Sequence, residues 1–138
     1  MTDVCVRLRW QPLGLVTVEA GKLVFPSPPA KPGVYRFALP ARVDRARSYI
    51  GQTDGLPRRF AHYRNPGPSQ RTNIRINALM TELLVEGGQV AVLVAVDGEL
   101  SIASKPIRLD FADKAHRLFA EGAALVSAGA EGVLLDNL

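Results

Sequence analysis

The stretch SYIGQTDGLPRRFAHYR, residues 48–64, joins a strand to a helix and gathers tyrosine, glycine, arginine and histidine at the junction. Residues 47–52 have the pattern of a strand, and Asp54 is a suitable N-cap for a helix that continues to about Arg64. Pro57 fits the first turn of this helix, because the N–H that proline lacks would have no partner there. We therefore expect a strand that ends where an arginine-bearing helix begins.

The segment before this junction predicts a second strand and a β extension. Residues 34–39, VYRFAL, form the second strand, and a loop at 40–46 makes an antiparallel pair the simplest arrangement. The run FPSPPAKPG, residues 25–33, carries four prolines and is expected to be an extended connector. Apolar and polar residues alternate over residues 4–25, which indicates an N-terminal β-hairpin extension.

The segment after the junction predicts a second helix and a central strand. A loop at residues 65–73 leads into a helical stripe of apolar residues at 74–85. Residues 90–96, VAVLVAV, are apolar on both faces and suit a central strand. Asp97-Gly98 then predicts a hairpin turn.

A last helix is expected after Asp110, a good N-cap, and should end at Gly129. Its predicted core-facing residues are Phe111, Ala115, Leu118, Phe119, Gly122 and Val126. The tail VLLDNL is read as a short final strand or an ordered coil. Together these elements predict an α+β fold, in which a small central antiparallel or mixed sheet is flanked by helices.

Length and composition indicate one globular unit. A chain of 138 residues is long enough to bury one core and too short for two full-sized ones. Its longest apolar run, residues 90–96, is far shorter than the roughly 20 residues that span a bilayer. A single cysteine, Cys5, cannot form an internal disulfide. We therefore expect a cytoplasmic protein without a membrane partner.

Positive charge is concentrated in residues 42–75. This segment holds eight arginines against two aspartates, a net charge of +6, whereas the whole chain carries +4. Such a block is typical of phosphate-backbone binding, and its alternative interpretation is a solvated arginine-rich surface. The arginines that we predict to contact nucleic acid are Arg47, Arg58, Arg64, Arg71 and Arg75.

The composite of GVYRF (33–37), SYIGQT (48–53), Leu56, the RRF arginines and Tyr63 resembles the paired motif of the GIY-YIG nucleases. The order of the predicted elements is also that of the family, whose members hydrolyse DNA phosphodiester bonds with one divalent metal ion. The resemblance covers residues 33–137. It implies a nuclease domain at 32–138, with residues 1–31 as the extension and connector.

The resemblance implies roles for two tyrosines and one arginine. Tyr35 of GVY would be the base or the group that orients the attacking water, with Tyr49 of YIG beside it. A phenol of pKa about 10 is a poor base unless a metal-bound water activates it or nearby positive charge favours phenolate, and arginine would supply that charge. Arg59 matches the helix arginine that such nucleases direct at the scissile phosphate. The alternative is that both tyrosines are half-buried strand residues with hydrogen-bonded hydroxyls.

Further site residues follow from the same helix and from the chain end. Tyr63 lies one turn after Arg59 and matches a family position for an aromatic or hydroxyl group. His62 lies one turn after Arg58, and either contacts phosphate, is simply exposed, or exchanges a proton with the attacking water. Arg58 points about 100° away from Arg59 and is expected to contact the DNA backbone, and the alternative is an ordinary exposed arginine. Asn137 matches the asparagine that closes the family pattern.

The resemblance implies that Glu121 is the metal ligand, for Mg²⁺ or Mn²⁺. The alternative is an ion pair between Glu121 and Arg117, one turn earlier on the helix. Gln52 departs from the family pattern, because several DNA-repair members have lysine there. A positive group near the phosphate is therefore either absent or supplied by Arg36 or Arg47.

These inferences favour a metal-dependent DNA endonuclease. A catalytically weak or inactive nucleic-acid-binding module on the same fold is the alternative, and a structural domain is a third interpretation. The sequence contains no zinc finger or helix-hairpin-helix, so a protein partner is one source from which substrate specificity could come.

Overall fold

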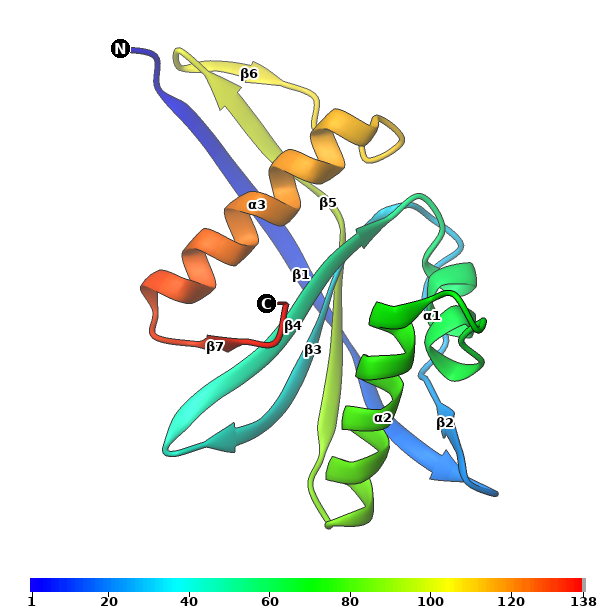
Figure 1. Cartoon of the computed structure of the whole chain (residues 1–138). Coiled ribbons are helices and arrows are strands. Elements are labelled where there is room, and N and C mark those ends of the chain that lie inside the picture. The colour runs from blue at the N-terminus through cyan, green and yellow to red at the C-terminus, as the bar shows by residue number, and fades with distance from the viewer. Residues whose placement is uncertain (138) are drawn as a thin grey trace.

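In residues 1–137, the part of the chain that the computed structural model describes, seven strands form one mixed sheet and three helices pack against it (Figure 1). The strands are β1 (Val4–Glu19), β2 (Lys22–Val24), β3 (Gly33–Arg42), β4 (Arg45–Thr53), β5 (Val90–Ile102), β6 (Lys105–Ile107) and β7 (Leu134–Leu135). The helices are α1 (Leu56–Arg64), α2 (Arg71–Val85) and α3 (Lys114–Ala130). The predicted α+β class is confirmed.

The sheet has the order β2-β1-β5-β3-β4-β7, and β6 pairs with β5. All pairs are antiparallel except β4 with β7. The predicted antiparallel pair of β3 and β4 is therefore present, and β5 is a central strand as its apolar run predicted. β3 lies between β4 and β5, which places the GVY segment in the middle of the sheet.

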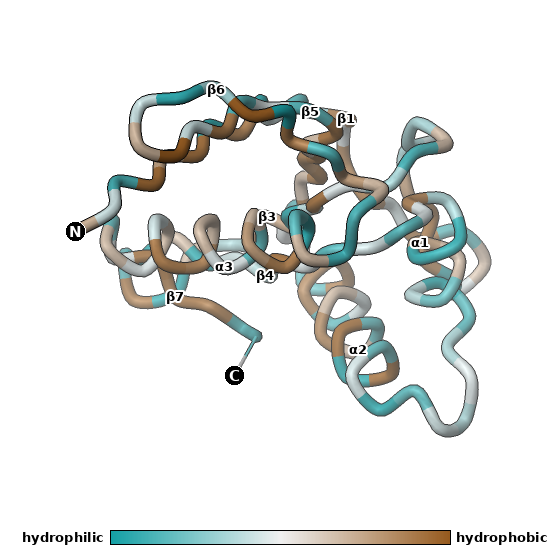
Figure 2. The backbone as a smooth tube through the Cα atoms, turned by 90° about the horizontal axis from the view of Figure 1, so that it is seen from above, coloured by the Kyte–Doolittle hydropathy of each residue, from teal (hydrophilic) through white to brown (hydrophobic). Residues whose placement is uncertain are grey.

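Two hydrophobic cores form, one on each face of the sheet. Helices α1 and α2 cover one face, where their apolar residues pack with those of β3, β4 and β5. Helix α3 covers the other face. Figure 2 shows the same division from above, with α3 on one side of β3 and β4 and with α1 and α2 on the other. A site at the ends of β3 and β4 can therefore receive side chains from α1 and α3 together.

The N-terminal hairpin forms as predicted, since β1 pairs with β2. It also joins the main sheet, because β1 pairs with β5 from Val4 opposite Ile102 to Val16 opposite Val90. The helices between Met1 and Asn137 include none that is long and apolar enough to cross a membrane.

The predicted turn at Asp97-Gly98 is wrong. Strand β5 continues through both residues, and the turn into β6 lies at Ala103 and Ser104, which both have positive φ. Gly98 is instead a point of close contact between strands, because a Cβ atom there would overlap the backbone oxygen of Arg7 on β1. The glycine allows the two strands to approach, rather than allowing the chain to reverse.

The predictions for the helix ends were partly wrong. Gly55, not Asp54, precedes α1, and α2 begins at Arg71, three residues before the predicted stripe. Asp113, not Asp110, is the N-cap of α3, and its side chain accepts a hydrogen bond from the Ala115 N–H. Asp110 instead accepts a hydrogen bond from the Ala112 N–H in the preceding turn.

The predicted core face of α3 was also wrong. Phe111 is buried as expected, but it precedes the helix. Among the other predicted residues, Leu118, Phe119 and Val126 are exposed. The residues that α3 buries are Arg117, Ala120, Ala124 and Ala128. A stripe of alanines brings the helix close to the sheet, so the larger apolar residues did not mark the buried face.

Candidate active site

Three tyrosine hydroxyl groups meet between the sheet and α1. Tyr35 on β3 and Tyr63 on α1 have their oxygens 2.7 Å apart, and the Tyr63 hydroxyl donates a hydrogen bond to the Tyr49 oxygen at 3.3 Å. Tyr63 can donate only one proton, so Tyr35 must be the donor in the first of these bonds. The hydrogen bonds therefore run in one direction, from Tyr35 to Tyr63 to Tyr49.

Gly51 of YIG makes room for this cluster. It lies directly opposite Tyr35 in the pairing of β3 and β4. A Cβ atom at Gly51 would overlap the hydroxyl oxygen and the Cζ atom of Tyr35, whose side chain is fully buried. The Tyr35 ring therefore lies across the backbone of β4, which explains why a glycine follows the second tyrosine at this spacing.

Changing Gly51 to alanine is expected to lower the free energy of unfolding by about 3 kcal/mol, because a buried ring must leave its position in a packed core. Chemical denaturation measures this loss. The double change Gly51→Ala with Tyr35→Leu should recover part of the stability, because leucine lacks the overlapping ring atoms. Gly51→Ala with Tyr35→Phe should recover little, since phenylalanine keeps Cζ. Equal stability of the wild type and Gly51→Ala would contradict the close contact.

Arg59 connects the tyrosine cluster to the surface. Its Nε donates a hydrogen bond to the Tyr35 oxygen at 3.0 Å, and its guanidinium carbon lies 5.7 Å from the centre of the Tyr63 ring. Arg59 and Tyr63 are one turn apart on α1, so the predicted shared face is present. Among residues 1–137, the terminal nitrogens of Arg59 have no hydrogen-bond partner, which leaves its planar end available to a ligand.

Burial keeps Tyr35 and Tyr63 protonated. It raises the pKa of Tyr35 to about 12, although the charge and the hydrogen bond of Arg59 act in the opposite direction. Burial also raises the pKa of Tyr63, and the neighbouring phenol groups raise it further. The expected preference for phenolate is thus reversed, because loss of hydration outweighs the arginine.

All three tyrosines of the chain belong to this cluster, so phenolate absorbance reports on it alone. In the native protein, Tyr35 and Tyr63 should form no phenolate at pH 10, whereas unfolded tyrosine titrates near a pKa of about 10. The folded state then binds more protons than the unfolded state, so stability should fall as pH rises above about 10. Alkaline spectrophotometric titration with unfolding curves tests this. More than one equivalent of phenolate in the native protein at about pH 10 would contradict it.

Glu121 reaches the same region from α3. The Gln52 backbone N–H and the Arg59 charge favour its ionised form, and both are close enough to affect its titration. Desolvation outweighs them and raises the pKa of the carboxyl group above its usual value. No ion pair joins Glu121 and Arg117 in the described residues, so the alternative interpretation of Glu121 is wrong.

Glu121 could hold a metal ion only as a single carboxylate ligand. Within residues 1–137, no group of three His, Cys, Asp or Glu side chains is placed to bind one. Mg²⁺ is commonly held by one or two carboxylates together with water and substrate phosphate, and Mn²⁺ accepts similar oxygen ligands. The residues present therefore fit a hydrated ion that is shared with a substrate, and not a closed structural metal site.

A basic pocket of about 370 Å³ lies between α1 and α3. Its lining residues are Gln52, Thr53, Asp54, Arg58, Arg59, His62, Lys114 and Arg117. Asp54 is the one acidic member of this set and is paired with Arg58. Arg59 also borders a second hollow of about 440 Å³ at the start of α2, lined by Arg71 and its neighbours. The predicted residues Arg58, Arg59 and His62 thus come together, and Arg71 lies on the other side of Arg59.

Arg117 and Lys114 line the basic pocket, and the sequence did not predict either of them as a site residue. Arg117 Nε donates a hydrogen bond to the Gln52 side-chain oxygen at 2.8 Å. The two arginines expected to supply charge beside Gln52 are bonded elsewhere, Arg36 to Ser48 and Arg47 to Asp136. Arg117 lies on the buried face of α3, and the apolar pattern of the sequence predicted a different face. Nothing in the sequence therefore indicated that Arg117 lines this pocket.

Asp136 and Asn137 near the chain end form hydrogen bonds with β4 and do not contact the tyrosine hydroxyl groups. The Asn137 side chain accepts a hydrogen bond from the Ile50 N–H at 3.0 Å and donates one to the Ile50 carbonyl. Arg47 forms a two-bond ion pair with Asp136, and Arg75 donates to the Asp136 carbonyl at 2.7 Å. Asn137, Arg47 and Arg75 therefore have structural partners at this edge, whereas Arg64 is exposed on α1.

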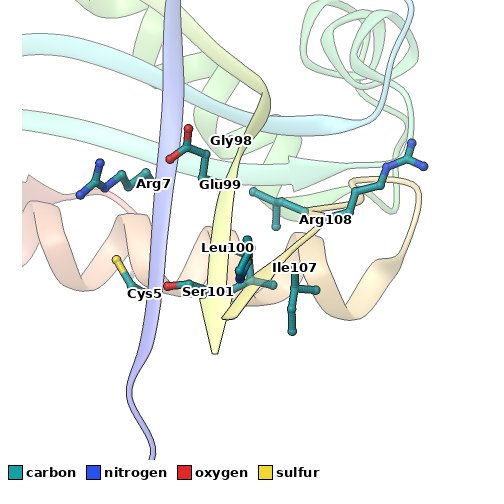
Figure 3. A pocket seen from close by; sticks show the side chains of 10 residues that line it. Cys5, Arg7, Gly98, Glu99, Leu100, Ser101, Ile107 and Arg108 are labelled. Atoms are coloured by element: carbon teal, nitrogen blue, oxygen red, sulfur yellow. The ribbon is translucent and has the colours of Figure 1, made fainter. Parts of the chain in front are cut away.

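A hollow of about 570 Å³ lies elsewhere, between β1, β5 and β6. Figure 3 shows Cys5 and Arg7 on β1 beside Ser101 of β5 and Ile107 of β6. It shares no residue with the tyrosine cluster or with the basic pocket.

Comparison of the chain with protein-family models, with curated proteins and with solved structures gave no match.

Proposed function

We propose that this protein is a metal-dependent endonuclease that hydrolyses DNA phosphodiester bonds. The observation that carries the proposal is the position of Arg59, which binds the buried tyrosine cluster with Nε and borders two hollows lined with basic residues. The resemblance of the sequence to the GIY-YIG motif supports the same reaction. We also propose a cytoplasmic location, and a protein partner as the source of substrate specificity.

Arg59 is suited to bind a phosphate group as negative charge accumulates during attack. Its bond to Tyr35 fixes the side chain, so its planar end can meet two phosphate oxygens without a further loss of rotamer freedom. Binding charge that develops in the transition state is the effect that raises the reaction rate.

The tyrosines orient groups rather than remove protons in this proposal. The Tyr35 oxygen accepts from Arg59, and its hydroxyl donates to Tyr63. Its pKa of about 12 makes it a poor base at neutral pH. The chain of bonds ends at Tyr49, whose own hydroxyl proton has no acceptor among the described residues. Tyr49 is only 6% exposed and lines neither hollow at Arg59, so a water molecule is the partner that this proton would have.

Glu121 would hold the divalent ion, which when bound supplies Lewis-acid stabilisation of the phosphate. The chain's own contribution is to keep this carboxylate near Arg59 and partly shielded from water. His62 lines the basic pocket, where phosphate contact is its simplest role.

A nucleic-acid-binding module without catalysis is the second candidate. The basic pocket favours it, because binding of the phosphate backbone needs positive charge but neither a general base nor a metal ion. Such a module would keep the basic pocket and would not need Glu121.

Incubation with supercoiled plasmid and Mg²⁺ or Mn²⁺ distinguishes the candidates. An endonuclease should give nicked and linear products, and EDTA should abolish them. Plasmid that stays intact, but is retarded in a salt-dependent gel shift, would support the binding module and exclude the nuclease. Absence of both effects would leave the structural interpretation.

A further inference from the structure

Arg117 is a buried arginine that has no acidic partner within residues 1–137. It is only 7% exposed, yet no carboxylate forms an ion pair with it among residues 1–137. Its Nε donates to the Gln52 side chain, and its Nη1 donates to the backbone oxygens of Phe111 and Ala112 at 2.8 and 3.2 Å. These neutral acceptors orient the guanidinium group but do not neutralise it. Burying such a charge is costly unless an anion compensates it.

The surroundings of Arg117 add positive charge. Lys114 lies one turn before it on α3, and Arg58 and Arg59 face the same pocket from α1. These four cations share the pocket with one carboxylate, Asp54, which leaves a net charge of +3. A pocket with this balance favours an anion with more than one charge.

The lining also selects for phosphate over a nucleobase. None of the eight lining residues is aliphatic, and none is Phe, Tyr or Trp. Bases are usually bound by stacking on aromatic rings, whereas phosphate oxygens are bound by arginine, lysine and side-chain donors. Gln52 and His62 offer polar atoms of the latter kind, whereas the Thr53 hydroxyl already donates to the Gly55 carbonyl.

We propose that Arg117 and Lys114 form a second phosphate subsite, which holds the phosphate adjacent to the scissile one on the same DNA strand. This inference rests on the proposed function, because it takes Arg59 as the group that binds the scissile phosphate. Two phosphates of one strand then occupy the two ends of the basic pocket. The nucleoside between them passes the pocket mouth, so the subsite fixes the register of the strand without reading its sequence.

Binding of thymidine 3′,5′-bisphosphate tests the subsite, because this molecule carries two phosphates on one nucleoside and has no diester to cleave. Titration calorimetry should show that the wild type binds it at least about tenfold more tightly than either thymidine monophosphate, which is the effect of one added charge-assisted contact. The His62 ring signal, which belongs to one of only two histidines, should shift on binding.

Arg117→Gln and Lys114→Gln should each remove most of the preference for the bisphosphate, and Lys105→Gln on the remote strand β6 should retain it. Lys114 is exposed and makes no side-chain hydrogen bond to residues 1–137, so Lys114→Gln should fold normally. This variant therefore tests the subsite even if Arg117→Gln does not fold. Equal affinities in the wild type, or a preference that survives in Lys114→Gln, would overturn the subsite. If the subsite is overturned but the wild type cleaves plasmid, the proposed nuclease function remains. If Lys114→Gln loses the preference for the bisphosphate but the wild type does not cleave plasmid, only the phosphate subsite remains.

Discussion

Replacing Arg59 by lysine is expected to lower the rate of DNA cleavage by about 10²- to 10³-fold, the range seen when one preorganised transition-state donor is removed. Lysine keeps the positive charge but loses the planar fork, so it cannot bind Tyr35 through one nitrogen and hold two phosphate oxygens with the others. The loss should appear in kcat, because the ground-state charge is preserved.

Arg58→Lys is the matched control for this change. Arg58 is the preceding residue of α1, is exposed, and is paired with Asp54 rather than with the tyrosine cluster. Its replacement should change cleavage by no more than about threefold, since lysine keeps the charge that Arg58 adds to the pocket and the exposed ion pair contributes little. Steady-state cleavage of a labelled duplex at saturating Mg²⁺ measures both variants. A loss of no more than about threefold in Arg59→Lys as well would show that charge alone, and not the geometry of Arg59, is required.

The arrangement of β3, β4 and α1 could be predicted because it depends on local sequence. Strand pairing places Tyr35 opposite Gly51, and one helical turn separates Arg59 from Tyr63. The spacing of these residues along the chain therefore carries most of the geometry of the cluster. The consequence of burial for the tyrosine pKa could not be predicted, because it depends on how completely α1 and α2 cover the sheet.

The α3 half of the site could not be predicted in the same way. The buried face of α3 consists of alanines and Arg117, while its larger apolar residues face solvent. A pattern based on hydrophobic size therefore indicated the wrong rotation of the helix. Glu121 was identified only through the resemblance, and its proximity to Arg59 became visible only in the folded chain.

Replacing Glu121 by glutamine is expected to abolish metal-dependent cleavage while leaving DNA binding in EDTA intact or tighter. Glutamine has nearly the same shape but is a much weaker ligand for a hard divalent cation. Removing a negative charge close to Arg59 also favours the approach of phosphate. Anisotropy with a labelled duplex, together with plasmid cleavage, separates the two effects.

The raised pKa of Glu121 adds a stability readout that does not depend on activity. A carboxyl group whose pKa is higher in the folded state binds more protons there, so its stabilising contribution is present at low pH and is lost as pH rises through the folded pKa. At neutral pH the ionised Glu121 therefore opposes folding, and Glu121→Gln should raise the free energy of unfolding.

Glu131→Gln, at the exposed end of α3, is the control for the change at Glu121 and should alter neither cleavage nor stability appreciably. In the wild type, cleavage should decline on acidification, because protonation of Glu121 competes with binding of the ion. If Glu121→Gln instead weakens DNA binding in EDTA and destabilises the fold, the carboxylate has a structural role. The proposal that Glu121 holds the metal ion would then be wrong. The role of Arg59 would still be tested separately by Arg59→Lys and its control.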